Sequence, residues 1–397
     1  MKKLFALLLV ALMVFSMAAC GNSAKKDDEL KVGFIFLHDE QSTYDKNFID
    51  AAVEACNKMG VTMVQKTQIP ESKACYDAAI ELIENEDCDI IFADSFGHES
   101  FLMDAAKEHP DVQFCHATGT QAHTAGIKNF PNAFASIYQG RYAAGVVAGL
   151  KLNEMIAAEK ITAEQAKMGY VGAFTFAEVI SGYTAFYLGA KSVCPTVTMD
   201  VKFTGSWYDE TKEKQAAQAL IDGGCVLISQ HADSMGAPTA CETAGVPNVS
   251  YNGSTAAACP ETFLISSRIN WVPYFEYMIT QVKNGAAIDK DWAGDLENGS
   301  VALTELGTAV AAGTAEKLAD VKAKLIAGEI NVFSTENFTV KGEKLTSYMA
   351  DVDTDKDYTK DTEAIADGIF QESKFRSGPY FDIEIDGITL LDRNYGD

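Results

Sequence analysis

One stretch, residues 201–234, constrains the fold most, because it contains a complete strand–helix–strand unit. An apolar run at residues 201–203 ends in a Thr-Gly-Ser turn, and apolar residues then recur at helical spacing over residues 216–221. After two glycines, residues 225–228 are apolar without interruption, as expected of a parallel strand that is covered on both faces. The unit therefore predicts a parallel α/β sheet.

The same alternation of strands and helices recurs along the 397 residues and starts again at Gln139. This repetition predicts two α/β lobes, each with a doubly wound parallel sheet. We assign residues 30–135 and 260–298 to the first lobe. Residues 136–259 and 299–397 form the second lobe, which includes a C-terminal extension. A cleft between two such lobes is the natural place for a small ligand.

The N-terminus predicts export. Residues 1–19 combine two lysines with an apolar run that is too short to span a membrane, as in a secretory signal peptide. The sequence SMAACG at residues 16–21 resembles a bacterial lipobox, which implies cleavage before Cys20 and a lipid on its sulfur; ordinary cleavage beside a chance cysteine is the alternative. Residues 20–29 would be a tether, so we expect a protein anchored by lipid to the outer face of the cell membrane.

Composition narrows the possible partners. The formal net charge of −24 argues against nucleic acid, which requires a basic surface. The apolar content of 47% is that of a globular protein. Eight cysteines follow Cys20, none in a C-x-x-C pattern and several within apolar strand or helix patterns, so we expect most of them to be small buried hydrophobic residues.

Polar and aromatic residues follow the predicted strands. Trp207 and Asp233 come directly after two strands of the central unit, and the carboxyl ends of parallel strands meet at one edge of a sheet. Both side chains would then face the ligand crevice; alternatively, Trp207 covers the start of a helix and Asp233 caps one. Near the C-terminus, Asp386-Gly387 between two alternating runs predicts a hairpin.

Several ordered motifs together resemble the basic membrane protein family of substrate-binding lipoproteins. Besides the lipobox they are SFG at 95–97, HATG at 116–119, YQGRY at 138–142, TGSWYD at 204–209 and QHADS at 230–234. The resemblance covers roughly residues 31–328. It implies a type I periplasmic-binding-protein fold, in which two Rossmann-like lobes joined by three crossovers close on a purine nucleoside or purine base. It also implies a monomeric, non-enzymatic receptor without cofactor, whose partners are an ABC permease and ATPase.

The resemblance also suggests site residues. Trp207 matches the family aromatic that stacks on the purine, whereas Ser42 stands where the opposite aromatic is usual, so Tyr44 would replace it. Ser254 stands where nucleoside receptors have an aspartate for the ribose, and two asparagines nearby are polar substitutes. The complete predicted set of ligand contacts is Tyr44, Ser95, Phe96, Thr118, Phe174, Trp207, Asp233, Asn252 and Asn270.

Other functions compete with this prediction. The same fold could hold another small neutral ligand, such as riboflavin or ribose. Ala93-Asp94-Ser95-Phe96-Gly97 after a strand mimics the nucleophile elbow of a serine hydrolase, with His231 as the base, but the full G-x-S-x-G is missing. The aspartates of residues 351–357 echo a calcium loop without its glycine and final glutamate, so we predict no metal site.

Overall fold

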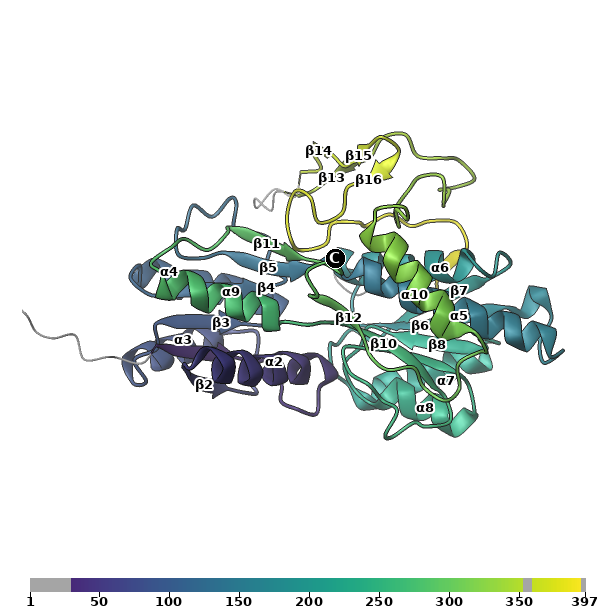
Figure 1. Ribbon diagram of the computed structural model, residues 1–397, viewed down its shortest axis with the longest axis horizontal. Helices are drawn as coiled ribbons and strands as arrows, with labels where there is room; N and C mark the ends of the chain where they lie inside the picture. Colours follow the sequence, from purple (N-terminus) through teal and green to yellow (C-terminus); the bar gives the residue numbers. More distant parts are fainter. Residues whose placement is uncertain (1–29, 353–358, 394–397) are drawn as a thin grey trace, which may run out of the picture. The chain divides into compact units, whose positions relative to one another are not determined.

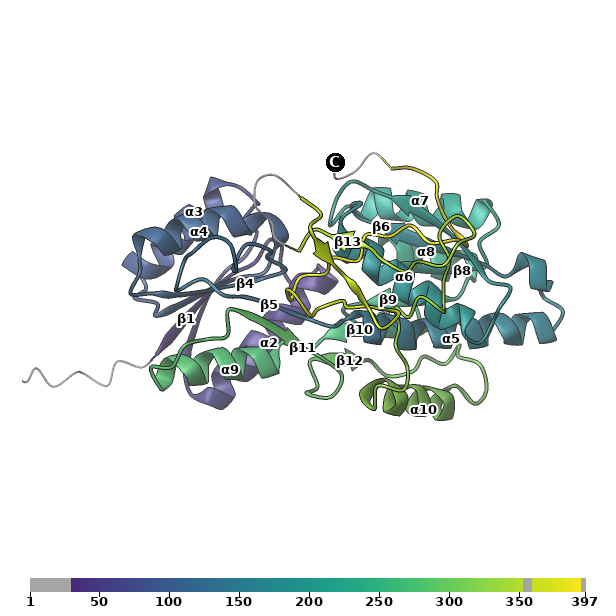
Figure 2. The same cartoon turned by 90° about the horizontal axis from the view of Figure 1, so that it is seen from above.

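Two sheets organise residues 30–352 and 359–393, which are the residues that the computed structural model describes (Figure 1). The first sheet has six strands, all parallel, in the order β11-β5-β4-β3-β1-β2. The strands are β1 (Lys31–Ile35), β2 (Thr62–Lys66), β3 (Ile90–Ala93), β4 (Gln113–Ala117), β5 (Asn132–Ala135) and β11 (Asp291–Gly294). Helices α2 (Thr43–Met59) and α9 (Val272–Lys283) lie on one face, and α3 (Lys73–Glu84) and α4 (Glu99–Glu108) on the other (Figure 2).

The second sheet has seven strands in the order β12-β10-β9-β8-β6-β7-β17. They are β6 (Lys167–Gly172), β7 (Thr198–Phe203), β8 (Leu227–Gln230), β9 (Asn248–Tyr251), β10 (Phe263–Ile269), β12 (Val301–Leu303) and β17 (Ile388–Leu390). Only β12 runs antiparallel to its neighbour within this sheet. Its helices are α5 (Tyr138–Ala157), α6 (Ala177–Lys191), α7 (Glu210–Asp222), α8 (Gly236–Ala244) and α10 (Thr314–Ile326).

The chain crosses between the two sheets three times, after β5, after β10 and after β11. The predicted α/β class, with two Rossmann-like lobes and three crossovers, is confirmed. One detail differs from the predicted boundaries: β10 lies in the second sheet, although we assigned residues 260–298 to the first lobe. The reason is that β10 pairs with β9, whereas α9, which follows it, packs against α2 in the first lobe.

An aromatic cluster fills the first lobe beneath α2 and α9. The Phe48 ring stacks on Trp271 with centroids 4.4 Å apart, and Phe92 meets Phe275 edge-on at 4.9 Å. Helix α2 carries Phe48 of this cluster and begins after Ser42. The Ser42 hydroxyl caps the helix by accepting a hydrogen bond from the Asp45 amide. The cap fixes where the first turn of α2 lies relative to the sheet edge.

In the second lobe, α5 and α6 pack unusually close. A Cβ on Gly145 of α5 would lie 2.0 Å from the Phe186 carbonyl oxygen of α6, and one on Gly189 would lie 2.0 Å from the Tyr142 carbonyl. Each helix therefore presents a glycine to the backbone of the other. This reciprocal contact explains why both helices are buried over most of their length.

All eight described cysteines are free and buried. They behave as the small hydrophobic residues that we predicted, and burial raises the pKa of Cys56 and Cys88 to about 11. Over the described residues, no helix is long and apolar enough to cross a membrane. The predicted signal peptide, the tether and Cys20 lie outside the described residues.

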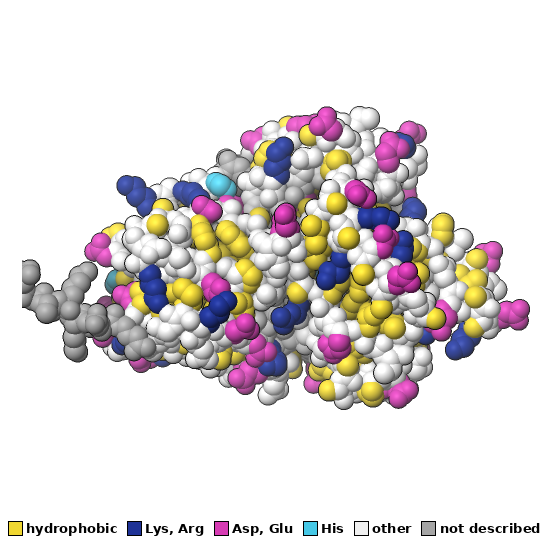
Figure 3. All heavy atoms as spheres, viewed as in Figure 1, with side chains coloured by type: hydrophobic (Ala, Val, Ile, Leu, Met, Phe, Trp, Pro, Cys, Tyr) yellow, Lys and Arg dark blue, Asp and Glu magenta, His cyan; other side chains and the backbone are white. Residues whose placement is uncertain are grey.

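The C-terminal extension forms two short two-stranded sheets, of β13 (Met349–Ala350) with β14 (Thr362–Glu363) and of β15 (Ile365–Ala366) with β16 (Ile369–Phe370). The predicted hairpin at Asp386-Gly387 is wrong. Residues 381–385 form no strand, and β17 instead pairs in parallel with the edge strand β7. The turn remains, because the Asp386 carboxylate accepts hydrogen bonds from Thr339 Oγ1 and from the amides of Lys341 and Gly342. Acidic and basic side chains are interspersed over the face in Figure 3.

We predict that Gly145→Ala lowers the free energy of unfolding by at least about 2 kcal/mol, because the new methyl group overlaps the α6 backbone. On an exposed helix the same change would be stabilising. Urea unfolding followed by circular dichroism measures the difference. Glu154→Ala, on an exposed part of α5, is the control and should change stability by less than about 0.5 kcal/mol. Equal stability of Gly145→Ala and the parent would contradict close helix packing.

Candidate functional site

A small cavity of about 20 Å³ lies where the carboxyl ends of both sheets meet. The first lobe lines it with Leu37, Tyr44, Ser95, Phe96 and Thr118, and the second with Glu178, Trp207, His231 and Asp233. Six of the nine predicted contacts are therefore together around one cavity. The remaining space is about that of one water molecule.

Tyr44 reaches the cavity from the first turn of α2. Its hydroxyl donates a hydrogen bond to the Asp94 carbonyl over 2.7 Å, and its ring packs on Phe48 at 4.8 Å. Ser42 is buried as the helix cap and donates from its hydroxyl to the Asp45 carboxylate over 2.6 Å. Tyr44, not Ser42, thus supplies the aromatic surface on this side.

Trp207 lies opposite, at the edge of an aromatic cluster of the second lobe. Its ring centroid is 4.9 Å from that of Phe174 and 6.0 Å from that of Phe176, and Phe176 in turn lies 5.3 Å from Phe96 of the first lobe. Phe174 is behind Trp207 and does not line the small cavity. The cluster holds the indole in place through packing.

Asp233 connects the lobes through its backbone and presents its carboxyl group to the cavity. Its amide donates to the Trp207 carbonyl over 3.0 Å, and its carbonyl accepts from the amide of Thr43 over 2.9 Å. Among the described residues, none donates a hydrogen bond to the carboxyl group. Burial, with smaller contributions from the carboxylates of Asp45 and Glu213, raises the pKa of Asp233 well above its usual range. It is not a helix cap, since α8 begins after Met235.

A buried arginine orients His231. Nη2 of Arg141, on α5, donates to His231 Nδ1 over 3.1 Å, and the guanidinium lies 3.4 Å from the Tyr251 ring centroid. Burial lowers the pKa of His231, and the hydrogen bond to Glu178 opposes this only in part. Because arginine can only donate, the neutral imidazole must carry its proton on Nε2, which lies 3.4 Å from Glu178 Oε1. The small cavity is thus lined by the Nε2–H donor of His231 and by the carboxylate of Glu178.

Ser95 is not paired with a histidine. Its hydroxyl donates to Glu71 Oε1 over 2.6 Å, and the Gly97 amide donates to the same oxygen over 2.7 Å. His116 Nε2 bonds the Ser95 carbonyl, not its hydroxyl. His231 contacts Arg141 and Glu178, so the Ser95–His231 pair that a serine hydrolase would need here is not formed in the described residues.

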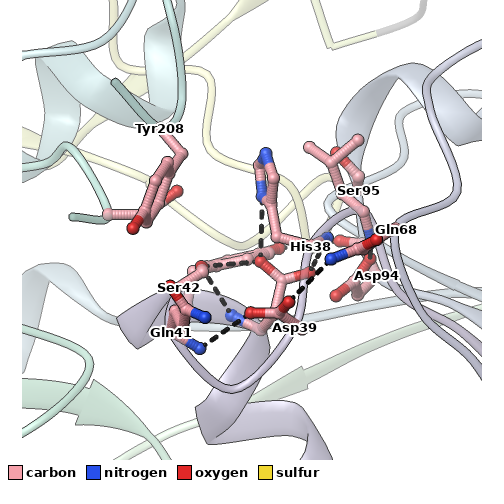
Figure 4. A network of polar contacts seen from close by, with 12 residues as sticks. His38, Asp39, Gln41, Ser42, Gln68, Asp94, Ser95 and Tyr208 are labelled. Atoms are coloured by element: carbon pink, nitrogen blue, oxygen red, sulfur yellow. Dashed lines mark hydrogen bonds and ion pairs between the residues drawn. The ribbon is translucent and has the colours of Figure 1, made fainter. Parts of the chain in front are cut away.

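A polar network beside Ser42 borders a further pocket, which shares Leu37 with the small cavity (Figure 4). The Asp45 carboxylate accepts from the His38 amide over 2.7 Å and from His38 Nδ1 over 3.2 Å. Asp39 accepts from the Gln68 amide group over 2.8 Å. The His38 ring faces Tyr208 of the second lobe with centroids 5.4 Å apart, so the lobes also meet here (Figure 4).

A second, larger cavity of about 590 Å³ adjoins the small one and shares Phe96, Thr118 and Glu178 with it. Thr118 follows β4 with a φ of 63°, a left-handed conformation that is unfavourable for a β-branched residue. Such strain concentrates at functional sites. Its position between the two cavities supports treating them as one cleft.

Two predicted contacts lie elsewhere. Asn252 follows β9, also with a left-handed φ of 64°, and lines an outer groove with Ser254, whose hydroxyl donates to Glu305. Asn270 lies in the crossover before α9, where Nδ2 donates to the Gly299 carbonyl over 3.2 Å and Oδ1 accepts from the Val272 amide. Neither residue lines the two cleft cavities.

Sequence reasoning missed Glu178, Phe176 and Arg141. Phe176 lies in the loop after β6 and Glu178 in the first turn of α6. The sequence analysis selected Phe174 from this region, and nothing in the pattern distinguishes the other two residues. Arg141 did carry a signal: it is a charged residue within a stretch of apolar residues and glycines, 140–150, of α5. In the described residues, no three histidine, cysteine or acidic side chains are grouped so that they could hold a metal ion.

Known proteins resemble this chain over most of its length. A family model described as ABC transporter substrate-binding protein PnrA-like, of the Bmp family, matches residues 35–336. The chain belongs to this family. The Bmp family comprises substrate-binding components of ABC transporters, so a small-molecule ligand and permease and ATPase partners follow, as does an extracytoplasmic location.

Two of the relatives that match this chain are 30% identical to it. One, from Brucella abortus (strain 2308), is named purine-binding protein and aligns over 79% of this chain and 86% of its own length. The other, from Haloferax volcanii, is named as an ABC transporter glucose-binding protein and aligns over 69% of this chain and 66% of its own length. The structure of an ABC transporter solute-binding protein from Aeropyrum pernix K1 has a TM-score of 0.64 at 17% identity, covering 79% of this chain and 94% of that one, and shows the same fold.

We predict that Glu213 makes stability depend on pH. This buried α7 residue accepts hydrogen bonds from the amides of Asp209 and Ser234, so it joins the Trp207 and Asp233 loops. Burial raises the pKa of Glu213 from 4.5 to about 7, so the folded protein favours the protonated form. Its contribution to stability is complete below pH 4.5 and falls by up to about 3 kcal/mol as the pH rises through 7.

Glu213→Gln should remove this part of the pH dependence. Urea unfolding at pH 5 and pH 8 measures it, with Glu210→Gln, an exposed residue on the same helix, as the control. An equal pH slope in parent and Glu213→Gln would show that Glu213 is ionised in the folded protein.

Proposed function

We propose that the protein captures a purine nucleoside or purine base in the cleft between its lobes and delivers it to an ABC importer. The observation that supports this most is the convergence of Tyr44 and Phe96 from one lobe with Trp207 and Asp233 from the other around a single cavity. A purine is flat, apolar on its faces and polar at its edge, and this lining offers aromatic surface together with a carboxyl group. The relative named purine-binding protein supports the same ligand class.

Binding would require the lobes to separate first. The small cavity has room for about one water molecule, and the Thr43 amide already bonds the Asp233 carbonyl across the cleft. A ring must therefore enter an open form. Since a ligand shifts such an equilibrium only through differential affinity, its contacts to both lobes would stabilise the closed form.

A sugar is the second candidate, favoured by the relative named as a glucose-binding protein and by the polar lining of the larger cavity. Isothermal titration of the protein without residues 1–29 separates the candidates. The panel is adenosine, guanosine, inosine, adenine, hypoxanthine, riboflavin, ribose and glucose. We expect one site for at least one purine compound and no turnover of it. Binding of glucose or ribose with no purine binding would refute the purine proposal.

Trp207→Ala should weaken purine binding about five- to a hundredfold, because stacking on an aromatic side chain contributes about 1–3 kcal/mol per base in nucleic-acid proteins. The same titration measures the loss. Trp292→Ala is the matched control, since Trp292 packs on Tyr274 at 5.1 Å in the first lobe, away from the cleft. Unaltered affinity in Trp207→Ala would mean that the indole only packs against Phe174.

We also propose that the protein is a monomer anchored through Cys20 to the outer face of the membrane. The support is the sequence alone: a short apolar signal followed by Ala18-Ala19-Cys20-Gly21. Cys20→Ala should release the protein from the membrane fraction or leave an unprocessed precursor. Mass spectrometry and fractionation measure this, with Cys56→Ala as the control for loss of a thiol; unchanged mass and membrane association in Cys20→Ala would exclude lipidation.

A further inference from the structure

The C-terminal extension contributes a wall of the larger cavity. The family match ends at residue 336, whereas Arg376, Pro379, Tyr380 and Asp382 line the cavity together with residues of both lobes. In Figure 1 the yellow chain of the extension passes over the region between the two sheets. The cavity of about 590 Å³ falls in the range typical of small-molecule sites.

The extension is fixed to both lobes at this point. The Ser377 amide donates to the Asp291 carboxylate of β11 over 2.8 Å, which ties it to the first lobe. Glu372 accepts from the Ser181 hydroxyl of α6 over 2.7 Å, which ties the extension to the second lobe. The Phe381 amide, within the extension, donates to Glu372 over 3.0 Å. The segment between these anchors is therefore held in a defined conformation beside the cavity.

Arg376 in this segment has an unused donor. The residue is only 7% exposed. Its Nε donates to the Gly378 carbonyl and its Nη2 to the Pro379 carbonyl, each over 3.0 Å. Within the described residues Nη1 has no hydrogen-bond partner. A buried, unpaired donor on a cationic group is costly and rare in folded proteins, so its position on a cavity wall points to a ligand oxygen as its partner.

The charge of the cavity excludes an anionic ligand. Glu99, Glu178, Asp351 and Asp382 line it, against Arg376 alone. Glu99 is engaged by the amides of Thr120 and Gln121. Asp382 is paired with Lys360 at 2.6 Å, which leaves three carboxylates against one guanidinium. This field is unfavourable for phosphate, whereas hydroxyl groups can donate to a carboxylate and accept from an arginine.

We propose that the C-terminal extension forms the second half of the ligand site, where Arg376 binds an oxygen atom on an uncharged, hydroxylated substituent of the ligand. The substituent would have the size and polarity of a pentose. This rests on the proposed function, which places the ring between Tyr44 and Trp207 once the lobes have separated enough to admit it. The shared lining of Phe96, Thr118 and Glu178 makes the two parts continuous.

Titration of the parent protein with each base and its nucleoside tests the proposal. Adenosine and inosine should bind at least tenfold more tightly than adenine and hypoxanthine, and adenosine 5′-monophosphate at least tenfold more weakly than adenosine. If the bases bind as tightly as the nucleosides, the extension takes no substituent and this inference fails while the proposed function stands. If none of the five compounds binds, the proposed function fails as well.

Arg376→Gln gives the residue-level test. This substitution should remove most of the difference in affinity between nucleoside and base, and should leave the affinity for the base within about twofold of that of the parent. The control Arg393→Gln, at an exposed residue of the extension that pairs with Glu384, should change neither affinity. An equal loss for base and nucleoside would mean that Arg376 only holds the Gly378 and Pro379 carbonyls, and would overturn the assignment. If Arg376→Gln does not fold, the parent titrations alone decide.

Discussion

The convergence of two sets of strand ends on one gap is the constraint on which the rest of the structure depends. A parallel strand delivers its following residues to one edge of its sheet, so the two lobes can share a site only if those edges face each other. The three crossovers after β5, β10 and β11 achieve this. Tyr44, Thr118, Trp207 and Asp233 all follow strands, and each side chain is positioned by the sheet behind it.

The cleft is held shut by few polar contacts. The amide and the hydroxyl of Thr43 both donate to the Asp233 carbonyl, and two ring contacts, His38 with Tyr208 and Phe96 with Phe176, also join the lobes around the small cavity. A hydrogen bond of this kind contributes about 1 kcal/mol net. Contacts of this number and type can be exchanged for ligand contacts. The extension also joins the lobes, through Asp291 of the first and Ser181 of the second, and must move when they separate.

Features that depend on the local sequence pattern, such as strand ends, could be predicted. Features that depend on contacts between residues far apart in the chain could not. Strand ends are visible in a pattern, which is why Trp207 and Asp233 could be predicted at one sheet edge; both line the small cavity. Asn252 lines an outer groove and has a left-handed backbone, neither of which is visible in the sequence pattern. The final hairpin was wrong because β17 finds its partner in β7, almost two hundred residues earlier. The role of Arg376 was invisible for the same reason: no pattern in the extension reveals which cavity it will border.

Both sheets are completed late in the chain. The first lacks its edge strand until β11 has been made, and the second lacks β17, at Ile388–Leu390, until the last residues have been made. Until then β7 is an open edge that can pair with other strands. Synthesis from the N-terminus therefore cannot yield either finished lobe early. For a member of an extracytoplasmic family, neither sheet can therefore be complete before the later part of the chain has emerged.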